Sequence, residues 1–114
     1  MHNFREMIIW KESLKLVRMV YEHTSTFPNE EKYGLRSQIN RAAVSIPSNI
    51  AEGSGRTTNK DFNHFLNIAM SSSYELETQL ILAHDIYKTE ISELINKLNE
   101  LQRMMGGFRK TLAA

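Results

Sequence analysis

The chain has 114 residues, of which 41% are hydrophobic and 24% are charged, and its formal net charge is +1. This composition is typical of one folded domain with a modest core, and it excludes disordered and collagen-like chains. The absence of cysteine excludes disulfide bonds and thiolate chemistry. A charge so close to zero gives no overall attraction to nucleic acid. We therefore expect a single domain over residues 1–114.

The amino-terminal segment does not resemble a secretion signal, because charged residues interrupt its apolar residues and no small-residue cleavage site follows. No uninterrupted apolar run reaches the roughly 18 residues that cross a bilayer. We expect a cytoplasmic protein without a membrane partner.

The first predicted helix covers residues 8–24. Its apolar stripe has helical spacing, and the helix ends before Pro28, since the residue preceding a proline is disfavoured in a helix. An acidic turn at residues 29–31 suits the positive start of the next helix. The stripe consists of Trp10, Leu14, Val17 and Tyr21.

The second predicted helix covers residues 33–53, and Gly53 is a natural end. Pro47 lies inside it, where proline removes a hydrogen bond at a cost of about 3 kcal/mol. Because the apolar phase continues past Pro47, we expect a kinked continuous helix, with Ser45 or Ser48 satisfying a freed backbone group. The alternative is a separate short helix that begins at Pro47.

The third and fourth helices are predicted over residues 59–87 and from about residue 90 to the end. Thr58 is a suitable cap for the third helix and Thr89 for the fourth. The pair Gly106-Gly107 weakens the last turns by about 1 kcal/mol per glycine. The fold class is therefore all-α, and an antiparallel up-down-up-down four-helix bundle is the simplest packing.

Two helices carry more apolar residues than one core stripe needs. We interpret the surplus as a subunit interface of a homo-oligomer, and the alternative is scattered exposed aliphatic residues. The surplus residues are Ile9, Leu16 and Met19 on the first helix and Ile68, Leu82 and Ile86 on the third.

A polar stripe also follows the second helix. It is either a solvated face or a line of hydrogen bonds to a neighbouring helix or subunit, since small alanines lie beside it. The stripe consists of Gln38, Arg41, Ser45, Asn49 and Glu52.

Residues 38–53 read QINRAAVSIPSNIAEG. With flanking matches such as Trp10-Lys11, Phe27-Pro28 and Glu75-Leu76-Glu77, this motif resembles the 23S rRNA intervening-sequence protein family, also called the S23 family. The resemblance covers nearly the whole chain and thins after about Ala83. One departure is Met70-Ser71-Ser72, where the family often has a basic residue and a glycine before the serine.

This resemblance implies a four-helix bundle that forms a ring-shaped homopentamer and is encoded in some bacteria within rRNA-gene insertions. The bundle is also similar to the accessory variability determinant of diversity-generating retroelements, which implies nucleic acid and a reverse transcriptase as partners. The resemblance brings no catalytic residues and no cofactor.

Local cations offer a route to RNA or DNA, although solvated surface residues are an equally good interpretation. No groove-reading motif is present, so contacts would go mostly to phosphates. The candidate residues are Arg36, Arg41, Arg56, Lys60, Arg103, Arg109 and Lys110.

An enzymatic alternative rests on Arg18 and His23. Their spacing is similar to the Arg-x4-His motif of HEPN-type ribonucleases, in which such a pair binds phosphate and assists proton transfer. Two residues are a short match, and we expect no enzyme. We also expect no metal, because no Glu-x-x-His motif occurs.

Overall fold

The computed structural model describes residues 2–113. Four α-helices account for most of this range: α1 (Ile8–Thr24), α2 (Leu35–Ser54), α3 (Asn59–Tyr87) and α4 (Ser92–Ala113). Single turns of 3-10 helix, Phe4–Glu6 and Asn29–Glu31, precede α1 and α2. The predicted all-α class is confirmed.

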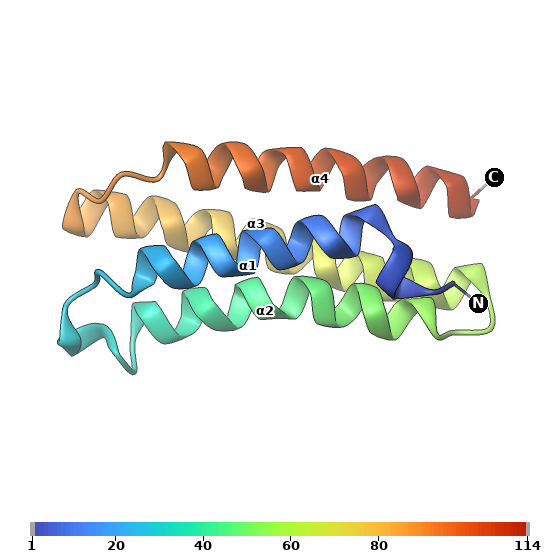
Figure 1. Ribbon diagram of the computed structural model, residues 1–114, viewed down its shortest axis with the longest axis horizontal. Coiled ribbons are helices and arrows are strands. Elements are labelled where there is room, and N and C mark those ends of the chain that lie inside the picture. The colour runs from blue at the N-terminus through green and yellow to red at the C-terminus, as the bar shows by residue number, and fades with distance from the viewer. Residues whose placement is uncertain (1, 114) are drawn as a thin grey trace.

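The helices alternate in direction and lie side by side (Figure 1). Each helix packs against the next one along the chain, and α4 packs back against α1. Among the described residues, the diagonal pairs α1–α3 and α2–α4 make no such contact. This is the predicted up-down-up-down bundle, 44 Å long and 23 by 20 Å across.

The two ends of the bundle are built from different parts of the chain. The α2–α3 loop and both chain ends lie at one end, which we call the terminal end (Figure 1). There the His2 amide donates to Ser54 O at 3.0 Å, and the Asn59 side-chain amide donates to Leu112 O at 3.4 Å. The α1–α2 and α3–α4 connections form the opposite end, which we call the loop end.

Helix α1 buries a different face from the one predicted. Ile9 and Leu16, which we assigned to an interface, lie in the core with Val20. Trp10 is only half-buried, and Tyr21 is 48% exposed. The assignment of Ile9 and Leu16 to an interface is therefore wrong.

Two polar residues on the buried line explain this error. Ser13 and Thr24 are buried on the same face as Leu16. The Ser13 hydroxyl donates to Trp10 O at 2.7 Å, and the Thr24 hydroxyl donates to Asn40 Oδ1 at 2.8 Å. Because these bonds satisfy the hydroxyls, burial costs little. Because Ser13 and Thr24 are polar, the buried face of α1 appears less apolar in the sequence than the stripe that contains Trp10.

Helix α2 runs without interruption through Pro47, which is buried. The continuous helix is confirmed, and the alternative of a separate short helix is wrong. The Ser48 hydroxyl donates to Val44 O at 2.9 Å, and the Asn49 amide donates to Ser45 O at 2.8 Å. The carbonyl that Pro47 leaves free is that of Ala43, so Ser48 does not satisfy the freed group as predicted. Ser48 and Asn49 instead add hydrogen bonds to the next two carbonyls.

The predicted cap of α3 is confirmed, and the predicted cap of α4 is wrong. Thr58 accepts the Asp61 amide at 3.1 Å, as predicted. At α4, however, the cap acceptor is the Glu90 carboxylate, which accepts the Ser92 amide at 2.7 Å. Thr89 instead shares a hydrogen bond of 2.5 Å with His23 Nε2.

Gly53 sets the approach of α2 to α3. A Cβ atom at this position would lie 2.8 Å from both Phe62 Cδ1 and Phe65 Cβ. Atoms this close overlap, so the two helices could not keep their separation with a larger residue here.

We expect Gly53→Ala to lower the free energy of unfolding by about 1–3 kcal/mol, because the methyl group would force Phe62 and Phe65 to move. Gly107→Ala is the matched control, since nothing lies within 4 Å of its Cβ position. It should raise the free energy of unfolding by about 0.5–1 kcal/mol through helix propensity. Urea denaturation measures both, and equal effects of the two substitutions would contradict the packing argument.

Candidate functional site

Basic residues gather at the terminal end of the bundle. Arg56 and Lys60 belong to the α2–α3 loop and the start of α3, and Arg109 and Lys110 belong to the end of α4. The Asn59–Leu112 hydrogen bond joins these two segments. Arg5 lies in the turn before α1 at the same end. We call these five residues the terminal basic cluster.

The side chains of the terminal basic cluster differ in their exposure and in the contacts that fix them. The Arg56 guanidinium lies 4.5 Å from the centre of the Phe65 ring and 3.5 Å from Glu52. Lys60 and Lys110 are exposed. Arg109 Nε is buried and has no hydrogen-bond partner among the described residues. The cluster therefore presents two exposed ammonium groups, while the guanidinium groups of Arg5 and Arg56 each lie 4.5 Å from the centre of a phenylalanine ring.

The other predicted cations lie elsewhere. Arg36 stands one residue after the start of α2, so about 30 Å of helix separates it from Arg56. Together with Lys32 and Arg41, Arg36 lines a separate hollow of about 420 Å³ between α1 and α2. Arg103 is exposed in the middle of α4. The structure thus brings four of the seven predicted residues to one end of the bundle, and the 3-10 turn that carries Arg5 lies at the same end.

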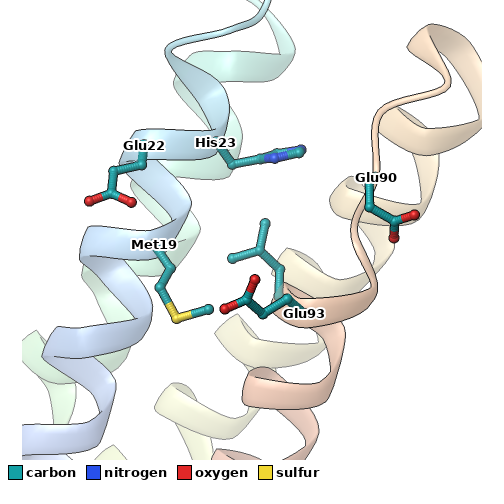
Figure 2. A pocket seen from close by; sticks show the side chains of 6 residues that line it. Met19, Glu22, His23, Glu90 and Glu93 are labelled. Carbon is teal, nitrogen blue, oxygen red and sulfur yellow. The ribbon is translucent and has the colours of Figure 1, made fainter.

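The loop end is acidic. A hollow of about 300 Å³ between α1 and the start of α4 is lined by Glu22, Glu90 and Glu93 together with His23 and Met19. Figure 2 shows the His23 ring directed toward the segment that carries Glu90 and Glu93. Burial lowers the pKa of His23, and a hydrogen bond from Ser92 lowers the pKa of Glu90. The hollow around His23 is therefore acidic, while the cations Lys32 and Arg36 lie in a separate hollow near the start of α2.

Arg18 and His23 both belong to α1, but their side chains have different surroundings. Five residues correspond to about 140° around a helix, so the two side chains point in different directions. His23 is bonded to Thr89, and carboxylates line its hollow. Such surroundings repel phosphate.

Metal-binding and membrane-spanning proteins are two other classes to which the described residues can be compared. Within residues 2–113, no group of three or more His, Cys, Asp or Glu residues is placed to hold a metal ion. None of the described helices combines the length and apolarity needed to span a bilayer.

The family model for 23S rRNA-intervening sequence protein matches residues 5–107. The chain belongs to this family. No curated protein matches its sequence.

The family motif of this intervening-sequence protein is a packing element in the structure. Ser45 Oγ and Ser72 Oγ lie 2.8 Å apart and bond α2 to α3, while Asn49 donates to Ser45 Oγ at 3.0 Å. Gln38, Arg41 and Glu52 are exposed. One part of the polar stripe therefore bonds to a neighbouring helix, and the other part is a solvated face.

A carboxylate at the loop end joins α2 to α3 in this family member. Glu31 accepts the Leu35 amide at 3.1 Å and also accepts a hydrogen bond from the Tyr87 hydroxyl. These bonds, the Tyr87 bond foremost, lower the pKa of Glu31, and the same bond raises the pKa of Tyr87. Because the folded pKa of Glu31 is lowered, its stabilising effect is present above the unfolded value and lost as the pH falls through the folded value.

We expect Tyr87→Phe to raise the pKa of Glu31 toward its ordinary value, because the largest stabiliser of the carboxylate is removed. NMR titration of the Glu31 carboxyl carbon measures the shift. Tyr74→Phe is the control, since the Tyr74 side chain is 56% exposed and lies on another part of α3. An unchanged Glu31 pKa in Tyr87→Phe would contradict the assigned bond.

Proposed function

We propose that this protein is a non-enzymatic, homo-oligomeric scaffold or accessory factor that binds nucleic acid electrostatically through the terminal basic cluster. The separation of charge along the bundle carries the proposal. Lys60, Lys110, Arg56 and Arg109 meet at one end, while the glutamates around His23 lie at the other. Polyanions are attracted to the first end and repelled by the acidic hollow around His23 at the second.

Contacts at the terminal end suit phosphates better than base edges. The exposed ammonium groups of Lys60 and Lys110 act as point charges without directional recognition. No described element of the terminal end is shaped to enter a groove: α3 and α4 present only their ends there. We therefore propose binding with little sequence preference.

Assembly multiplies a modest local charge. In the ring-shaped homopentamer that the family resemblance implies, bundles arranged with a common direction would place five terminal basic clusters on one face. Glu52 and Asp61 partly offset the cations in a single copy. A ring compensates for this weakness, because several weak contacts to one polyanion act together.

We expect the double variant Lys60→Gln, Lys110→Gln to bind RNA and duplex DNA more weakly than the wild type at low salt. Each lost phosphate contact should reduce the slope of log K against log salt by about 0.9 for duplex DNA. Fluorescence anisotropy at several salt concentrations measures both quantities.

The matched control is Lys11→Gln, Lys88→Gln, which removes the same charge from exposed lysines outside the terminal basic cluster. It should retain most of the wild-type affinity. Equal losses in the two double variants, or no binding by the wild type at low salt, would contradict the proposed interface.

We expect no RNA cleavage above background from the purified protein, and no change in His23→Ala, because His23 serves the Thr89 contact. Denaturing electrophoresis of a labelled RNA measures the products. Cleavage by the wild type that is lost in His23→Ala and Arg18→Ala would instead support the ribonuclease alternative.

A further inference from the structure

An apolar groove lies open between α1 and α2. It has a volume of about 340 Å³ and is walled mainly by aliphatic and aromatic side chains. Three of the four residues in the stripe that the sequence predicted for the core form its α1 wall. The principal lining residues are Trp10, Leu14, Val17, Val44, Pro47 and Ala51, and we call this surface the α1–α2 groove.

A second apolar surface lies on the outside of α3. Ile68, Leu82 and Ile86 are 37%, 45% and 60% exposed. At about 100° per residue they fall within about 40° of one another, so they form one ridge along the helix. We call these three residues the α3 ridge. These residues are exposed, and α3 makes no contact with α1 among the described residues, so the ridge does not fill the groove of its own chain.

Cations adjoin the groove and a carboxylate adjoins the ridge, where Glu75 also shares a hollow with Arg41 of its own chain. Val44 lines both the α1–α2 groove and the adjoining hollow, and that hollow contains Lys32 and Arg36. On α3, the exposed Glu75 lies seven residues from both Ile68 and Leu82, on the same face. A groove facing a groove would bring cations together, and a ridge facing a ridge would bring Glu75 against Glu75. The pairing of groove with ridge is the favourable one.

We infer that the α1–α2 groove of one copy receives the α3 ridge of a second copy. This inference rests on the proposed function, which takes the protein to be a homo-oligomer. After pairing, the first copy still has a free ridge and the second a free groove, so the contact is heterologous and generates a closed ring or an open chain of copies.

Two substitutions test the two surfaces separately. Val44→Arg places a charge in the groove, and Leu82→Arg places one on the ridge; both residues are partly exposed, at 39% and 45%. Each variant alone should lose assembly and have the mass of one chain in size-exclusion chromatography with light scattering. An equimolar mixture should form dimers and nothing larger, because one intact groove meets one intact ridge.

Ile81→Arg is the matched control. Ile81 is 46% exposed on the same helix, but it lies about 100° or more from the ridge residues, and the variant should assemble as the wild type does. Circular dichroism checks the fold of each variant. If Val44→Arg or Leu82→Arg fails to fold, Ser48→Arg in the groove and Ile86→Arg on the ridge replace them, since Ser48 lines the groove and is exposed and Ile86 is 60% exposed.

The outcomes separate the two proposals. A wild-type monomer would overturn both the homo-oligomer and this interface, and it would leave the groove to a different occupant. A wild-type oligomer that persists in both variants, or a mixture that stays monomeric, would overturn the groove-to-ridge pairing alone.

Discussion

The close contact between α2 and α3 is the constraint on which the rest of the structure depends. Ala42 and Ala43 are buried on α2, and Gly53 leaves no room for a side chain beside Phe62. The Ser45–Ser72 bond can form only because the helices approach so closely. Pro47 is accommodated within this contact, and neighbouring side chains supplement the hydrogen bonds around it. The family motif is therefore best understood as the residues that hold these two helices together.

The close packing of α2 against α3 determines which apolar residues of the bundle stay exposed. Helix α1 packs on α2 through Ile9, Leu16 and Val20, and its other stripe is left along an open groove. Helix α3 packs against α2 with one face and against α4 with another, and a third face carries exposed aliphatic residues. A monomer that keeps both surfaces in water forgoes the free energy of burying them. The assembly that we propose would recover that free energy.

The number of helices, their approximate ends and the bundle topology could be predicted from the sequence, because helical periodicity and turn residues are local signals. The rotation of α1 could not, because two stripes have the same spacing and the true one contains Ser13 and Thr24. Thr89 was misassigned as a cap because its hydrogen bond to His23 spans the fold. The basic residues were identified as a set, but only the folded chain separates Arg36 and Arg41 from Arg56 and Lys60. Long-range contacts of this kind leave no pattern in neighbouring residues.

The central claim is that copies of this bundle bury one another's surplus apolar surface. Small-angle X-ray scattering of the wild-type protein tests it most directly, because a single bundle has a known size of 44 by 23 by 20 Å. We predict a particle whose mass is several times that of one chain and whose pair-distance distribution is that of a hollow ring. A scattering curve that fits one isolated bundle at the highest soluble concentration would contradict the account.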